Sequence, residues 1–161
     1  MKTAICSALL LMFISTVSAV MPDDNVSSRH TTVFPCVMVR YSTPIKVSGV
    51  FGVAIWRPLG NSQYFGPFFQ LEPGLGGGKI TIGMRYGECR FMPVFNAGIA
   101  ASLLHSWGDR LQGVEKGNTY AGLEGSVGFF VLGINGGVFY HIAGDDDDSE
   151  WIYSLGIGVG I

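Results

Sequence analysis

The sequence WIYSLGIGVGI at residues 151–161 alternates two kinds of residue. Its odd-numbered positions are large and apolar, from Trp151 to Ile161, whereas its even-numbered positions are isoleucine, serine and three glycines. An alternation with a period of two is typical of a β-strand whose two faces differ. This segment therefore predicts a strand with one bulky apolar face and one narrow face.

The same alternation recurs along most of the chain. The further segments cover about residues 32–41, 44–56, 65–72, 80–86, 91–103, 120–131 and 134–142, with the first two fitting the pattern less cleanly. Together with 151–161 they make eight candidate strands. Short strands at regular spacing, separated by turn residues, are typical of an all-β sandwich or barrel.

The composition excludes several other classes of protein. The chain has 161 residues, of which 48% are hydrophobic, only 14% are charged, and 24 are glycine. Disorder needs low hydrophobicity and high charge, and glycine in this amount penalises helix interiors. The net charge of −2 argues against a nucleic-acid partner held by a basic face.

The chemistry of the narrow face separates a soluble barrel from a membrane barrel. A soluble fold buries its bulky face and exposes a polar one, but here the second face is mostly glycine, alanine and serine. Small side chains suit the narrow interior of a closed eight-stranded barrel, and the bulky face then points to lipid. We therefore expect an all-β, up-and-down antiparallel transmembrane β-barrel of about eight strands. A soluble secreted barrel that binds an apolar ligand is the alternative.

Connection lengths and aromatic residues fit the membrane interpretation. The expected connections are 42–43, 57–63, 74–78, 87–90, 105–118, 132–133 and 144–149. The two most polar later connections, 105–118 and 144–149, fall on the side where outer-membrane barrels have long external loops. Aromatic residues near strand ends are candidates for interfacial girdles. These are Trp56, Tyr64, Tyr86, Trp107, Tyr140, Trp151 and Tyr153.

The N-terminus has the pattern of an export signal. Lys2 precedes an apolar run from Ala4 to Ile14, and Val17-Ser18-Ala19 provides a small-residue cleavage site. We therefore expect a signal peptide at 1–19, an N-terminal extension at 20–31 and a barrel domain at 32–161.

A few polar residues of the narrow face are candidates for function. Glu72, Arg85 and Glu124 are expected to face the lumen, where charges must pair with one another. A charge cluster that fills the lumen is the preferred interpretation, and a narrow pore built from the same groups is the alternative. Cys36 and Cys89 both fall at the periplasmic end of such a barrel, and the sequence leaves open a disulfide or two separate thiols.

Other candidate sites are weaker. Asp145, Asp146, Asp147 and Asp148 form an acidic external loop without the spacing of a calcium loop, so we expect no metal site and no cofactor. His105 and Ser106, with acidic residues downstream, suggest a lipid A-modifying enzyme as a minor alternative. Neighbouring strand residues point to opposite faces, so the expectation is a protein without enzymatic activity.

In its pattern of eight strands, the segment 32–161 resembles the small outer-membrane barrels of the OmpA/OmpX-like and opacity-protein-like group. The last strand resembles the assembly signal of such proteins, although it ends in Ile161 and not in an aromatic residue. The resemblance implies an outer-membrane protein of a Gram-negative bacterium, or of a phage that infects one, with a structural or surface-interaction role. The implied partners are outer-membrane lipid and lipopolysaccharide, the barrel-assembly machinery and an unidentified surface ligand.

Overall fold

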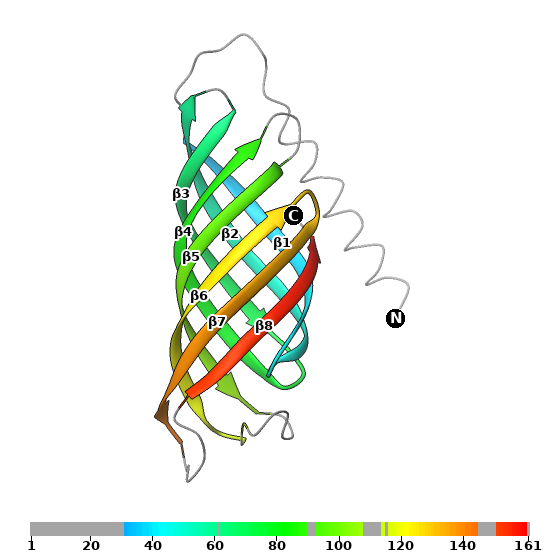
Figure 1. Ribbon diagram of the computed structural model, residues 1–161, viewed down its shortest axis with the longest axis vertical. Helices are drawn as coiled ribbons and strands as arrows, with labels where there is room; N and C mark the ends of the chain where they lie inside the picture. Colours follow the sequence, from blue (N-terminus) through cyan, green and yellow to red (C-terminus); the bar gives the residue numbers. More distant parts are fainter. Residues whose placement is uncertain are drawn as a thin grey trace.

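The protein forms a single closed antiparallel β-barrel of eight strands (Figure 1). The computed structural model describes residues 31–60, 62–89, 93–107, 114, 116–144 and 151–160. The predicted signal peptide 1–19 and nearly all of the extension 20–31 lie outside the described residues. The strands are β1 (Thr32–Ser42), β2 (Lys46–Gly60), β3 (Gln63–Pro73), β4 (Gly77–Cys89), β5 (Pro93–Ser106), β6 (Thr119–Phe129), β7 (Leu132–Ala143) and β8 (Trp151–Gly160). The described residues contain no helix that is long and apolar enough to cross a membrane.

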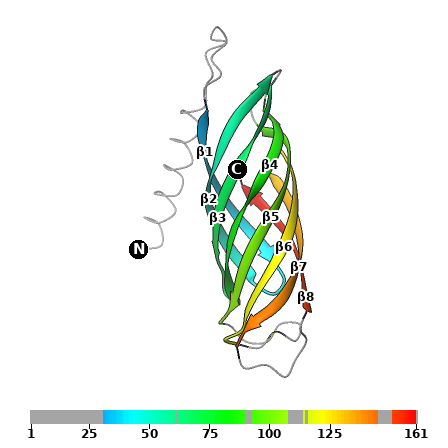
Figure 2. The same cartoon turned by 90° about the vertical axis from the view of Figure 1, so that its left-hand side faces the viewer.

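Each strand pairs with the next one in sequence, so the fold is the up-and-down barrel that the alternation predicts. The connections after β1, β3, β5 and β7 lie at one end of the barrel, which we call the loop end. β1 begins and β8 ends toward the opposite end, which we call the terminal end (Figure 2). The ring is closed by β1 and β8, which pair only over Met38–Ser42 and Gly156–Gly160.

One predicted connection is much shorter than expected. The sequence places a seven-residue turn at 57–63, but β2 continues to Gly60 and β3 starts at Gln63. Pro58 and Gly60 are turn-favouring residues, yet here they lie at a bulge in the β2–β3 pairing, where the sheet tolerates them.

The bulky apolar face of every strand is on the outside of the barrel. In β8, for example, Tyr153, Leu155 and Ile157 are exposed, whereas Ser154, Gly156 and Gly158 are buried. The assignment to an interfacial girdle was wrong for two aromatic residues, because Trp56 and Tyr64 are buried inside the barrel and not on its surface. Trp56 lies on the inward face of β2, and Tyr64 occupies the inward face at the start of β3.

The many glycines make room for large side chains across neighbouring strands. Glu124 in β6 pairs with Gly137 in β7, and a Cβ atom on Gly137 would lie 2.6 Å from Glu124 Cγ. Asn135 in β7 likewise pairs with Gly156 in β8, where a Cβ atom would lie 2.6 Å from Asn135 Oδ1. The lumen is thus packed by large-to-small pairs, as the narrow interior of an eight-stranded barrel requires.

Candidate functional site

The centre of the lumen holds four buried charged residues, which we call the charged layer: Arg40, Glu72, Lys79 and Glu124. They come from β1, β3, β4 and β6, so the layer crosses the barrel. Each lies on the inward face of its strand, because its neighbours in sequence point outward.

Three ion pairs join these residues into one chain of alternating charge. Arg40 Nη1 lies 2.6 Å from Glu72 Oε2. Lys79 Nζ lies 3.0 Å from the same Glu72 oxygen and 2.7 Å from Glu124 Oε1. Lys79 therefore bridges the two carboxylates, and its side chain is fully buried.

Hydroxyl and amide groups complete the hydrogen bonding of both carboxylates. Ser48 donates to Glu72 Oε1 at 2.7 Å. Ser102 donates to Glu124 Oε2 at 2.7 Å, and Asn135 Nδ2 donates to Glu124 Oε1 at 2.9 Å. A buried ion pair repays its desolvation only when such additional hydrogen bonds are made. The charged layer meets this condition, and its two cations balance its two anions.

The structure brings together two of the three charged residues that the sequence singled out. Glu72 and Glu124 belong to the charged layer, but Arg85 does not and lies nearer the terminal end. Sequence reasoning missed Arg40 and Lys79. The alternation in β4, extended two residues upstream from Thr81, would have placed Lys79 on the inward face, but the glycines at 76–78 indicated a loop there.

An apolar cluster closes the lumen at the loop end; we call it the apolar plug. Its buried members are Ile45, Leu104, Val114, Tyr120, Phe139 and Ile152. Ile45 lies in the β1–β2 turn and Val114 in the β5–β6 connection, so both connections contribute side chains to it. Trp107 helps to hold this end together, since its indole Nε1 donates to the Gly74 carbonyl oxygen at 3.1 Å.

Three aromatic rings fill the β1–β3 side of the terminal end; we call them the aromatic stack. The Phe34 and Trp56 ring centroids are 4.4 Å apart with an interplanar angle of 8°. The Trp56 and Tyr64 centroids are 3.8 Å apart with an angle of 14°. All three side chains are buried.

The two cysteines are not joined in the structure. Cys36 is a buried free thiol on the inward face of β1, and Arg85 Nη1 approaches its sulfur at 3.8 Å. Cys89 is the last residue of β4, and its side chain is outside what the structure describes. β1 and β4 are separated by β2 and β3 in the ring, and this separation is an obstacle to a Cys36–Cys89 disulfide, which needs Cα atoms within about 7 Å.

His105 and Ser106 point to opposite faces of β5. His105 is exposed, and its Nδ1 forms a 2.9 Å hydrogen bond with Thr119 Oγ1. Ser106 is buried, and its hydroxyl donates to the Asn118 carbonyl oxygen at 3.3 Å. The pair therefore does not form a common nucleophile and base arrangement.

The acidic segment Asp145 to Asp148 falls between β7 and β8, outside the described residues. Within the described ranges, no group of three or more histidine, cysteine, aspartate and glutamate residues is placed to hold a metal ion.

The outer surface forms an apolar belt around the barrel. Its most exposed members include Ile99, Leu123 and Tyr153, which are 72–74% exposed. On the described strands, the outward-facing positions between the strand ends carry no charged residue. Arg57 and Glu88 lie near the terminal ends of β2 and β4.

Comparison of the chain with known protein families, with curated proteins and with solved structures found no match.

Proposed function

We propose that the protein is an outer-membrane β-barrel with a structural or surface-interaction role and a lumen closed by its own side chains. The observation that carries the proposal is the inversion of the two faces: charged residues are buried inside, and the apolar belt is exposed outside. In a soluble barrel this large apolar surface would be in contact with water. Soluble monomers rarely expose an apolar patch of that size. A bilayer makes the same surface favourable.

The strand lengths support this proposal. β8 has 10 residues and β2 has 15, whereas a tilted strand needs about 9–11 residues to cross the hydrocarbon core. The closed ring also pairs the strand backbones with one another, and a bilayer requires internal pairing of every backbone group. Export by the expected signal at 1–19 would bring such a chain to the periplasm, the compartment that faces the outer membrane.

The contents of the lumen favour a closed barrel over a narrow pore. The apolar plug occupies the loop end, and the charged layer crosses the lumen next to it with its charges balanced and hydrogen-bonded. The soluble ligand-binding alternative needs an apolar interior, but the middle of this lumen is charged.

Fractionation tests the membrane assignment. The full chain is expressed in a Gram-negative host, and we expect it in the outer-membrane fraction, with a gel mobility that changes on heating as the barrel unfolds. Recovery in the soluble periplasm without a mobility shift would contradict the proposal.

Planar-bilayer recording separates the closed barrel from the pore. We expect no unitary current steps from the refolded protein, whereas regular steps would favour the pore.

A further inference from the structure

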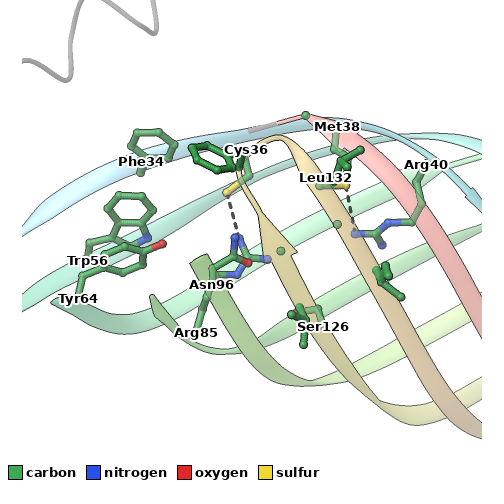
Figure 3. A pocket seen from close by; sticks show the side chains of 16 residues that line it. Phe34, Cys36, Met38, Arg40, Trp56, Tyr64, Arg85, Asn96, Ser126 and Leu132 are labelled. Atoms are coloured by element: carbon green, nitrogen blue, oxygen red, sulfur yellow. Dashed lines mark hydrogen bonds between the residues drawn. The ribbon is translucent and has the colours of Figure 1, made fainter. Parts of the chain in front are cut away.

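A small chamber lies in the lumen between the charged layer and the terminal end; we call it the terminal chamber. It has a volume of about 50 Å³, and its lining includes Cys36, Met38, Trp56, Arg85, Asn96 and Ser126. Figure 3 shows the aromatic stack on one side of it and Arg85 and Asn96 beside Cys36. β6, β7 and β8 also contribute Gly128, Gly133 and Gly160 to the lining. A Cβ atom on Gly128 would clash with Asn96 Nδ2, so the absence of a side chain there makes room for the Asn96 amide.

Arg85 brings a positive charge to this chamber, and no described residue forms an ion pair with it. Its guanidinium lies 4.5 Å from the centroid of the Phe68 ring and approaches the Cys36 sulfur, which is a weak acceptor. Its Nε is buried and has no hydrogen-bond acceptor in the described part of the chain. The charged layer is neutral by itself, so among the described residues the charge of Arg85 is not balanced by a carboxylate, which is costly in a partly dehydrated interior.

A second buried donor lines the same chamber. The indole Nε1 of Trp56 also has no hydrogen-bond acceptor among the described residues. The Asn96 amide and the Ser126 hydroxyl add further donors to the lining together with their own acceptor oxygens, and none of the described lining residues is acidic. Buried polar groups in native proteins are almost always satisfied, so two donors without acceptors at one cavity indicate that something else supplies the acceptor.

We propose that the terminal chamber binds a small monovalent anion of halide size, held by Arg85 with the Trp56 indole and the Asn96 amide. The volume decides the size of the ligand. About 10–15 Å³ is enough to hold one water molecule, so the chamber has room for an anion and a few waters. Drug-sized organic ligands occupy pockets of about 300–1,000 Å³, which is far more than this chamber offers. Water alone would satisfy the donors but would not balance the charge of Arg85.

This site goes beyond the proposed function and does not depend on it, because the chamber is inside the barrel wherever the barrel resides. Its test therefore uses the full chain refolded in detergent micelles, in which membrane location plays no part.

The first measurement is the apparent unfolding temperature, read from the circular dichroism of the sheet during heating, which needs no gel mobility shift. Sodium bromide replaces sodium gluconate at constant ionic strength, since gluconate is too large for the chamber. A ligand that binds only the folded state stabilises that state. We therefore expect the midpoint temperature of unfolding to rise with bromide concentration and to level off when the chamber is saturated. The rise is expected to disappear in Arg85→Met. Arg57→Met is the matched control, because Arg57 is exposed on the outer face of β2 and its loss should leave the rise unchanged.

The second measurement uses Trp56 as a local probe. Among the three tryptophans of the chain, Trp107 and Trp151 are replaced by phenylalanine, so that Trp56 alone fluoresces. Bromide quenches an indole that it contacts, so we expect saturable quenching in the Arg85 protein and only weak, linear quenching in Arg85→Met. If Arg85→Met does not fold, competition replaces it: chloride should reduce the saturable quenching, and gluconate should not.

Two results would overturn the proposal. One is an unfolding midpoint that is the same in bromide and gluconate, which would show that water alone fills the chamber. The other is a bromide effect that survives in Arg85→Met or that is lost equally in Arg57→Met, which would show a general salt effect.

Discussion

The charged layer and the terminal chamber occupy the same lumen, yet they satisfy their charges in opposite ways. In the charged layer, Arg40 and Lys79 are paired with two carboxylates that the barrel itself supplies. In the terminal chamber, Arg85 lies against an aromatic ring and a thiol. The difference indicates that the first region is a structural element complete in itself, whereas the second is built to accept a partner from outside the chain.

The largest expected effect is the loss of Lys79, which is the central cation of the charged layer. Lys79→Met keeps an unbranched side chain that is one atom shorter, but it leaves Glu72 and Glu124 with one cation between them. Removing one partner of a buried pair costs about 3–5 kcal/mol, so we expect a loss of this size in the free energy of unfolding, measured by urea titration in lipid vesicles.

A double variant checks the reason for this loss. Lys79→Met with Glu124→Gln restores the charge balance, because Arg40 and Glu72 then remain as one pair. We expect it to recover part of the lost stability. A double variant as unstable as the sum of its two single variants would contradict the view that charge balance holds this region together.

The next effect concerns the outside of the barrel, where the outward positions described in the structure carry no charged residue between the strand ends. Leu155→Arg adds an unpaired charge to the apolar belt. An arginine on the lipid face near the bilayer midplane costs about 2–4 kcal/mol, and we expect the membrane-inserted state to lose stability by this amount. Folded fraction on unheated gels and urea titration in vesicles measure the loss. Leu155→Ala keeps the site apolar and is the control, and normal insertion of the arginine variant would mean that this face does not meet lipid.

A smaller effect compares two glycines of β7, one in each region. Gly137 lies against Glu124, which is fixed by its hydrogen bonds, so Gly137→Ala overpacks the charged layer and is expected to cost about 1–3 kcal/mol. At Gly133 an added Cβ meets only the end of the flexible Met38 side chain, at 3.2 Å. Gly133→Ala is therefore expected to be close to neutral by urea titration. If both substitutions lowered the free energy of unfolding equally, the charged layer and the terminal chamber would not differ in how tightly they are packed.

The smallest effect is expected from Arg85→Met in a gluconate buffer. Loss of the contact with Phe68 removes a cation–π interaction of about 0.5–2 kcal/mol, but it also removes a buried charge without a partner. We expect the free energy of unfolding to change by about 1 kcal/mol or less, measured by the same urea titration. A loss as large as that of Lys79→Met would show that Arg85 is structural, as Arg40 and Lys79 are.

Much of the fold could be predicted from the sequence because large apolar residues alternate with small or polar ones, with a period of two, along most strands. Glycine, serine and charged residues of β8, β6 and β4 alternate with large apolar ones, and the structure has these faces as expected. The prediction failed where a residue type suggested a turn or an interface. Pro58 and Gly60 indicated a turn within what is the end of β2. Trp56 was a candidate for an interfacial girdle because aromatic residues are common at membrane interfaces, although the alternation put it on the same face as Gly52 and Ala54.

The candidate site could be predicted only in part. The inward direction of Glu72, Arg85 and Glu124 follows from alternation, but which of them meet depends on the stagger between strands that are not neighbours in sequence. Lys79 joins carboxylates of β3 and β6. Such a contact across the lumen leaves no local signal in the sequence. The separation of Arg85 from the charged layer therefore becomes visible only in the structure of the closed barrel.

The short pairing of β1 with β8 has a consequence for how the barrel assembles. Seven of the eight strand pairings join consecutive strands, so they can form by local hairpin closure. The eighth brings together residues more than one hundred positions apart, over five residue pairs, and closing so long a loop carries an entropic cost that local pairing avoids. We therefore expect the sheet to form first as an open, curved ribbon, and the β1–β8 seam to be the last contact made and the first one lost.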